Sequence, residues 1–191
     1  NKLGAMFTRH VGVAFRSTRL RGGTMVGMPL RREIEDLDRS ARRTDAISFF
    51  GLDAAKPILL VTGGSLGARK INTTISQSVP QLLGAGWQVL HISGNSADLV
   101  DPQLAGYTLL PYCDRMDLAI AVADLAVARA GAATVSELSA VGVPAVYVPY
   151  PVGNGEQRFN ARGLVAAGGA ELVEDARVTP DWVRGALAGL G

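Results

Sequence analysis

The chain has 191 residues, of which 48% are apolar and 19% charged, and its formal net charge at pH 7 is +2. This composition is typical of a globular protein with a buried core and excludes global disorder, and the irregular spacing of its 23 glycines excludes a collagen-like repeat. The charge is uneven, because residues 1–43 contain ten Lys and Arg against four acids. Such a segment could bind a nucleic acid, an anionic lipid or a phosphate ligand. The alternative interpretation is a solvated, arginine-rich surface without a ligand.

The few cysteines and histidines limit the chemistry of the chain. A lone cysteine, Cys113, excludes an internal disulfide and favours a reducing, cytoplasmic compartment. His10 and His91 are far apart in the sequence, so we expect no Cys/His metal site and interpret all three side chains as structural. No stretch reaches the roughly 18 apolar residues that a membrane span needs. Because the chain starts at Asn1 and stops just after an expected helix, we expect a fragment of a longer protein.

The amino-terminal residues lie outside the regular pattern of the chain. Residues 10–15 and 24–26 predict two short strands. The charged stretch 31–43, which follows Pro29, predicts the passage from one domain to another. We therefore expect residues 1–32 to hold the last strands of one domain and a linker, and residues 33–191 to form a second domain.

From residue 56 onward, short aliphatic runs alternate with amphipathic stretches, which is typical of βα units on a parallel sheet. The predicted strands are residues 57–62, 87–92, 107–110, 125–128, 144–149 and 170–173. The predicted helices are residues 66–83, 114–123, 134–141 and 156–167, and a final helix opens at Thr179-Pro180-Asp181, with a cap, a first-position proline and a first-turn acid. Six strands with intervening helices predict an α/β fold with a doubly wound, Rossmann-like parallel sheet.

A glycine-rich turn, residues 62–68 (TGGSLGA), lies between the first of these strands and the following helix. Glycines let the backbone turn tightly, and a helix amino terminus offers unpaired N–H groups to a phosphate. We hypothesise phosphate binding here, with a purely structural turn as the alternative. Arg69 stands where a short-chain dehydrogenase has glycine, and no Gly-Lys-Ser/Thr follows the turn, so the pattern disfavours a nicotinamide enzyme and excludes a P-loop.

Two more polar segments follow later strands. In residues 129–137 (RAGAATVSE), Thr134 and Glu137 have the spacing of a capping box, which would satisfy helix amides without a ligand. The small residues before them would instead leave amides open to a phosphate at the carboxyl edge of the sheet. In residues 149–161 (PYPVGNGEQRFNA), several side chains suit sugar hydroxyls, and an ordinary acid-rich first helical turn is the alternative.

Taken together, VTGGSLGARKIN at 61–72, RAGAATVSELSAVGVPAVYVPYP at 129–151 and EQRFNA at 156–161 resemble the carboxyl-terminal half of the MurG family. GMPLRREI at 27–34 resembles the interdomain linker of that family. The resemblance implies a GT-B glycosyltransferase whose carboxyl-terminal domain binds the donor UDP-N-acetylglucosamine. It also implies inverting transfer of N-acetylglucosamine to the 4-hydroxyl of lipid-linked N-acetylmuramyl-pentapeptide, which converts lipid I to lipid II in peptidoglycan synthesis.

The resemblance further implies no cofactor, no nucleic acid partner and peripheral contact with the anionic cytoplasmic face of the bacterial plasma membrane. It places the catalytic base and the site for the lipid-linked acceptor in the amino-terminal domain. We therefore expect this chain to bind donor without turnover. A non-catalytic nucleotide-sugar binding module and a related GT-B enzyme with another acceptor remain alternatives.

Carried over residue by residue, the resemblance assigns most of the donor site. Glu137 matches the acid that binds the ribose hydroxyls, and the main chain at Cys113 matches the strip that reads uracil. The sugar contacts correspond to Gln157 and to Glu156, which replaces a glutamine of the family, while Asn160 fits the same helix. The diphosphate turn corresponds to Ser65 and the amides of Gly64 and Leu66, and Arg31 to an arginine near the phosphates. The diphosphate and sugar contacts correspond to Ala132, Ala133 and Thr134.

Overall fold

The main body of the molecule is a six-stranded sheet, seen in a computed structural model that describes residues 3–64, 68–94, 99–152 and 155–187. Its strands all run parallel, in the order β5-β4-β3-β6-β7-β8. Each overlaps a strand expected from the sequence, so the doubly wound α/β sheet is confirmed. The strands are β3 (Ile58–Thr62), β4 (Gln88–Ile92), β5 (Tyr107–Leu110), β6 (Leu125–Ala128), β7 (Ala145–Tyr147) and β8 (Ala170–Leu172).

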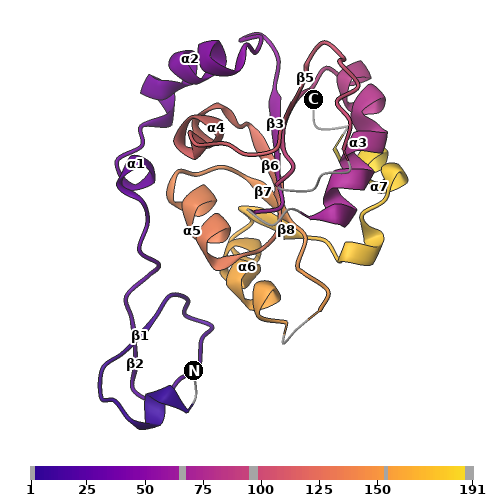
Figure 1. Ribbon diagram of the computed structural model, residues 1–191. Coiled ribbons are helices and arrows are strands. Elements are labelled where there is room, and N and C mark those ends of the chain that lie inside the picture. Colours follow the sequence, from indigo (N-terminus) through magenta and orange to yellow (C-terminus); the bar gives the residue numbers. More distant parts are fainter. Residues whose placement is uncertain (1–2, 65–67, 95–98, 153–154, 188–191) are drawn as a thin grey trace.

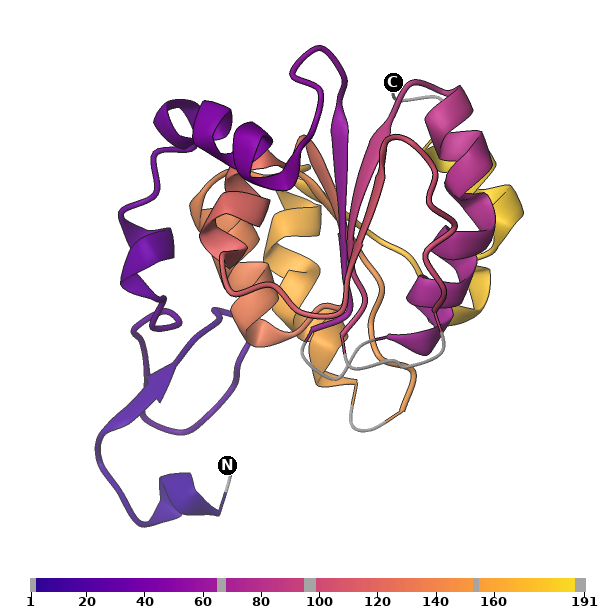
Figure 2. The ribbon, with the colours of Figure 1, turned by 45° about the horizontal axis from the view of Figure 1, so that its top comes forward.

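Helices cover both faces of this sheet (Figures 1 and 2). One face carries α3 (Arg69–Gly84) and α7 (Pro180–Ala186). The other carries α4 (Met116–Val122), α5 (Ala132–Ala140) and α6 (Glu156–Ala166). Two 3-10 turns are also present, at Gly4–Met6 and Asp175–Arg177. In the same part of the chain, no helix is both long and apolar enough to span a membrane.

The core consists of two apolar layers, one on each side of the sheet. Strand β3 is buried throughout, and its successive side chains point to opposite layers. Leu60 packs in the layer beneath α4 and α5, whereas Leu59 and Val61 pack in the layer beneath α3 and α7. A strand covered on both faces needs continuous rather than alternating apolar residues, and the run ILLVT meets that need.

The final helix begins as its sequence predicts. The Thr179 side chain caps α7 by accepting a hydrogen bond from the Trp182 amide, and Pro180 occupies the first helical turn. The other four predicted helices are present, although α3 starts three residues later than expected, at Arg69, and α5 two residues earlier, at Ala132.

The charged stretch 31–43 is largely helical, which the sequence analysis missed. It contains α1 (Arg32–Glu35) and the start of α2 (Arg39–Phe50). The Asp38 side chain caps α2 by accepting from the Ala41 amide, and the helix ends at Gly51 with a left-handed φ of 65°. Helix α2 packs against α4 and α1 against α5. The linker residues are therefore attached to the sheet domain through these helices.

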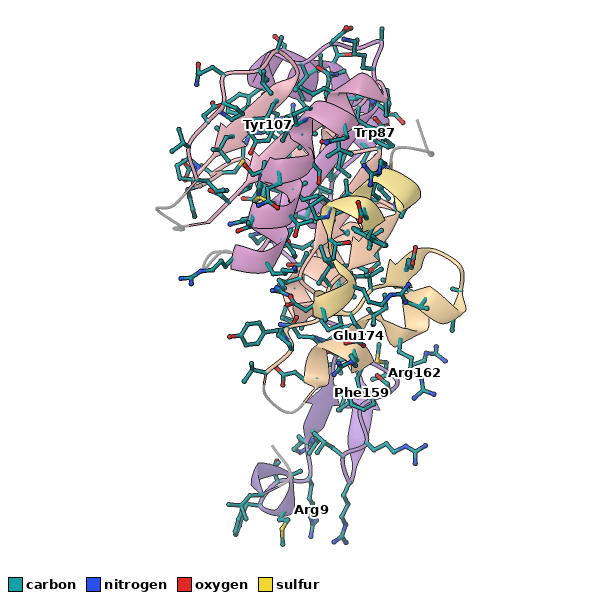
Figure 3. The ribbon with its side chains drawn as sticks, turned by 90° about the vertical axis from the view of Figure 1, so that its right-hand side faces the viewer. Arg9, Trp87, Tyr107, Phe159, Arg162 and Glu174 are labelled. Carbon is teal, nitrogen blue, oxygen red and sulfur yellow. The ribbon has the colours of Figure 1, made fainter. Side chains whose placement is uncertain are left out.

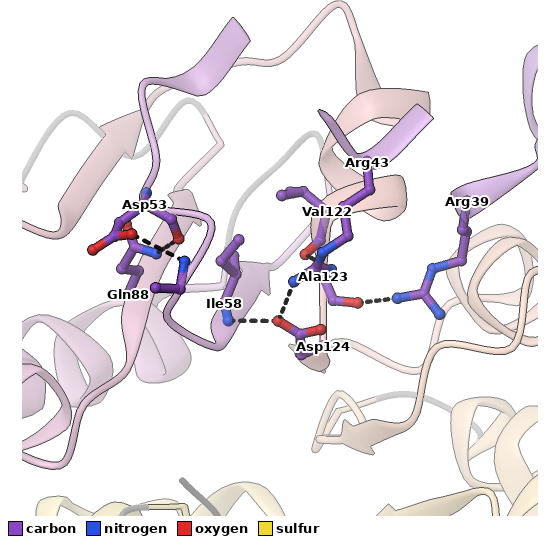
Figure 4. A network of polar contacts seen from close by, with 9 residues as sticks. Arg39, Arg43, Asp53, Ile58, Gln88, Val122, Ala123 and Asp124 are labelled. Carbon is purple, nitrogen blue, oxygen red and sulfur yellow. Dashed lines mark hydrogen bonds and ion pairs between the residues drawn. The ribbon is translucent and has the colours of Figure 1, made fainter. Parts of the chain in front are cut away.

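Part of the basic segment is structural rather than solvated, as Figure 4 shows. Arg39 donates to the Ala123 carbonyl, and Arg43 donates to the Val122 carbonyl at 2.9 Å. Arg43 also pairs with Asp124 at 2.9 Å. These bonds cap the carboxyl end of α4 and hold α2 against it. Burial lowers the pKa of Arg39, although the Asp124 carboxylate opposes that effect.

The amino-terminal residues form a separate two-stranded parallel sheet of β1 (Val11–Val13) and β2 (Gly23–Met25). The Ser17 hydroxyl donates to the Phe159 carbonyl at 3.2 Å, which joins this sheet to α6. Figure 3 shows Phe159 and Arg162 beside these strands, with Arg9 further out. Both predicted short strands are present, and the proposed domain boundary after residue 32 stays a prediction.

Candidate functional site

A cleft of about 530 Å³ opens at the carboxyl edge of the sheet. It lies beside the point where the strand order reverses, between β3 and β6, and open α/β sheets bind their ligands at this point. Half of the twelve predicted site residues line it: Arg31, Gly64, Cys113, Ala133, Thr134 and Glu137. The structure thus gathers residues from the linker, from the turn after β3, from the segment after β5 and from α5.

The end of β3 contributes Thr62 to the cleft, and the turn after it contributes Gly64. Gly64 has a φ of +81°, a left-handed conformation that glycine adopts without strain, and its amide donates to the Thr62 hydroxyl at 3.3 Å. The predicted diphosphate residues Ser65 and Leu66 lie outside the described residues. Helix α3 follows, and its N-cap residue Ala68 provides no side-chain cap. The first amides of α3, at the carboxyl edge of the sheet, therefore receive no hydrogen bond from an Ala68 side chain.

The capping-box interpretation of residues 134–137 is wrong. The N-cap of α5 is Gly131, whose carbonyl accepts from the Val135 amide at 2.9 Å, so Thr134 lies inside the first turn. The small residues 131–133 let the helix start early, and glycine has no side chain with which to cap the amides. The amino end of α5 is therefore open to an anion at the cleft.

Glu137 is paired with the linker instead of with its own helix. The Nε and Nη2 atoms of Arg31 donate to Glu137 Oε1 at 3.1 and 2.9 Å. The Arg31 side chain is 51% exposed and that of Glu137 only 14%. A guanidinium suited to phosphate and a carboxylate suited to hydroxyl groups thus meet at the cleft, and both bonds use one carboxylate oxygen.

The segment after β5 forms another wall of the cleft, with Pro111, Tyr112 and Cys113. Cys113 is buried, and this burial raises the pKa of its thiol, so the side chain is a neutral, apolar group at this wall. The main chain of the same residues is the part that the sequence analysis assigned to uracil.

The predicted residues of α6, and Ala132 of α5, lie outside the lining of the cleft. Gln157 Oε1 accepts from the Tyr150 amide at 2.9 Å, and the Asn160 side-chain amide donates to the Ala130 carbonyl at 3.0 Å. These bonds tie α6 to the loop after β7 and to the turn before α5. Glu156 opens the same helix. Their assignment to the sugar stays a prediction.

The sequence analysis included Arg129 in the polar segment at this edge but gave it no role. Its Nη1 atom donates to the carbonyls of Val148 and Pro149 at 3.2 Å and pairs with Asp175 at 2.6 Å. Arg129 is 9% exposed, and its guanidinium lies 5.6 Å from the Tyr150 ring. The ends of β6 and β7 are therefore joined by a buried cation. An arginine directly after an apolar strand was the available sequence signal.

In the described part of the chain, no group of three or more His, Cys, Asp or Glu could hold a metal.

An open six-stranded parallel sheet, with a cleft at its switch point beside the uncapped start of α5, is the Rossmann-like architecture that GT-B glycosyltransferases contain. The chain belongs to the family described as glycosyltransferase family 28 C-terminal domain, whose model matches residues 58–190. The GT-B fold and the resemblance to MurG are confirmed by the relatives that follow.

The chain is 63% identical over 183 residues to the Leifsonia xyli protein named UDP-N-acetylglucosamine--N-acetylmuramyl-(pentapeptide) pyrophosphoryl-undecaprenol N-acetylglucosamine transferase, covering 96% of this chain and 51% of that protein. The Clavibacter michiganensis protein of the same name is 56% identical, with 96% and 50% covered. The crystal structure of Acinetobacter baumannii MurG matches with a TM-score of 0.70 at 28% identity, covering 94% of this chain and 51% of that one. The chain spans about half the length of the curated relatives it matches.

Proposed function

We propose that this chain is the donor-binding half of an inverting glycosyltransferase, which moves N-acetylglucosamine from UDP-N-acetylglucosamine to lipid-linked N-acetylmuramyl-pentapeptide. The product of that transfer is lipid II of peptidoglycan synthesis. The observation that carries the proposal is 63% identity to a transferase of that name, combined with a cleft lined by six of the matching residues. The chain's own part in the reaction is to hold the donor and to stabilise its leaving group.

The leaving group is UDP, whose diphosphate gains negative charge as the glycosidic bond breaks. Uncapped amides at α5, the turn at Gly64 and the Arg31 guanidinium place positive charge around the cleft before the reaction begins. Preorganised donors stabilise developing charge without the cost of reorientation. In this arrangement Arg31 reaches the diphosphate from the linker and neutralises part of its charge.

The nucleoside is held by the walls of the same cleft. Glu137 is the proposed acceptor for the ribose hydroxyls, because the Arg31 bonds occupy Oε1 and Oε2 is the second acceptor of the carboxylate. The main chain at Cys113 is the proposed contact of the uracil ring. Gln157, Glu156 and Asn160 on α6 are the proposed neighbours of the sugar.

The acceptor and the catalytic base belong, in this proposal, to the part of the relatives that this chain does not span. The exposed arginines before β1 and between β1 and β2 suit contact with an anionic membrane on its cytoplasmic face: Arg9, Arg16, Arg19 and Arg21. Nucleic acid is not among the proposed partners.

Calorimetric titration of the 191-residue chain with UDP-N-acetylglucosamine, UDP and a thymidine diphosphate sugar tests the proposal. We expect both uridine ligands to bind and the thymidine ligand to bind at least about tenfold more weakly. EDTA should leave the affinity unchanged, because amides and Arg31 supply the charge that faces the diphosphate. Equal or tighter binding of the thymidine ligand would favour a related enzyme with another donor and acceptor.

A further inference from the structure

A buried network of hydrogen bonds joins α3 to β4 and β5 behind the cleft. His91 of β4 is fully buried, and its ring nitrogens lie 3.1 Å from Asn72 Oδ1 and 2.9 Å from the Tyr107 hydroxyl. The Asn72 side-chain amide donates to the Ser93 carbonyl at 2.8 Å. Asn72 is 1% exposed, so all three bonds are shielded from water.

The partners of this network allow one arrangement of protons. The Ser93 carbonyl can only accept, so the Asn72 nitrogen faces it and Oδ1 faces His91. Nε2 of His91 must then carry the proton, and Nδ1 accepts from the Tyr107 hydroxyl. Burial lowers the pKa of His91 to about 4, which keeps the ring neutral at physiological pH. The network is therefore a fully satisfied and rigid connection.

The network reaches the cleft without lining it. Asn72 belongs to the first turn of α3, where its backbone amide donates to the Ala68 carbonyl at 2.8 Å. Ser93 precedes Gly94, a residue of the cleft wall, and the Ser93 amide donates to the Leu110 carbonyl at 2.9 Å. Leu110 in turn precedes the wall residue Pro111. The side chains of Asn72 and His91 thus hold three chain segments in register at the carboxyl edge.

We propose that Asn72 and His91 are positioning residues for the diphosphate of a nucleotide bound in the cleft. They hold the first turn of α3 in a fixed position against the ends of β4 and β5, so that the first amides of that helix face the phosphates. This inference rests on the proposed function, because it needs a nucleotide in the cleft. A network that only stabilised the fold would not favour the phosphates over the nucleoside.

The test compares His91→Leu and His91→Gln with a control on the same helix. Thr74 is 2% exposed, and its hydroxyl donates to the Val178 carbonyl at 3.2 Å, away from the cleft. Thr74→Val keeps the shape of the side chain and removes one buried hydrogen bond. Each variant is titrated with UDP and with uridine, which has no phosphates, and its melting temperature is recorded.

We expect His91→Leu to weaken UDP binding by about tenfold and uridine binding by less than about twofold. His91→Gln retains an N–H donor toward Asn72 and should recover part of the UDP affinity. Thr74→Val should lower the melting temperature while leaving both affinities within about twofold. If His91→Leu does not fold, Tyr107→Phe removes only the hydroxyl bond to Nδ1 and should show a smaller loss that is again confined to UDP.

Equal weakening of UDP and uridine, or an unchanged UDP affinity in a variant with a lower melting temperature, would overturn the positioning role. Failure of the proposed function is recognised separately, because the unaltered chain would then bind neither UDP nor UDP-N-acetylglucosamine.

Discussion

At the scale of single residues, Glu137 is where binding and stability can be separated. Its carboxylate accepts two hydrogen bonds from Arg31 and lines the cleft. Because the Arg31 side chain is 51% exposed, this ion pair contributes no more than about 1 kcal/mol to stability. A carboxylate that accepts from ribose hydroxyls should contribute more, about 1.5–3 kcal/mol, to nucleotide binding.

We therefore expect Glu137→Ala to weaken UDP binding by roughly 10- to 150-fold, with a small change in melting temperature. Glu137→Gln retains an acceptor oxygen without the charge and should show an intermediate loss. Calorimetry and thermal unfolding on the same samples measure the two effects. A UDP affinity within about twofold of the unaltered chain would show that Glu137 serves only the ion pair.

At the scale of secondary-structure elements, Asp124 connects three of them at the edge opposite the cleft (Figure 4). It directly precedes β6, and its Oδ2 atom accepts from the Ile58 amide at the start of β3 and from Arg43 of α2, each at 2.9 Å. These bonds hold α2 against β3 and the start of β6. Helix α2, which begins in the charged stretch, is therefore held against the sheet.

Asp124→Ala leaves the Ile58 amide without its acceptor, and we expect a loss of about 1–3 kcal/mol in the free energy of unfolding. Asp124→Asn keeps an oxygen for that amide and loses mainly the partly exposed ion pair with Arg43. We therefore expect it to lower the free energy of unfolding by about 1 kcal/mol or less. Chemical denaturation measures both. UDP affinity should be unchanged in each variant, and a large loss of affinity would contradict the separation of this edge from the cleft.

At the scale of the whole molecule, we expect the 191-residue chain to bind UDP-N-acetylglucosamine and to transfer no sugar. The chain spans about half the length of its curated relatives, and the residues proposed here contact only the donor. Transfer of labelled N-acetylglucosamine to the lipid-linked acceptor measures this. Activity should be restored when the chain carries the remaining length of those relatives. Turnover by residues 1–191 alone would contradict the assignment of base and acceptor site to the other half.

Much of the fold could be predicted because its signals are local. A parallel strand buried on both faces requires a continuous apolar run, so residues 58–62 predict β3 from composition alone. A glycine-rich turn between a strand and a helix also predicts an anion site, and that site stays a prediction. Thr179 and Pro180 predict a helix start because a cap acts within three residues of itself. Asp38 and Gly51 are local start and stop signals of the same kind for α2. The sequence analysis did not use them, because it interpreted the arginine-rich stretch as a passage between domains.

The sequence by itself therefore determined the strands, most of the helices and the turns that carry the cleft. Only the tertiary structure decided the strand order, which places β3 beside β6 at the switch point. It also decided the pairing of Arg31 with Glu137, 106 residues apart, and the contact of His91 with Asn72. The physical reason is that capping and strand burial depend on neighbours within a few residues, whereas these contacts depend on how crossover connections bring distant segments to the same edge.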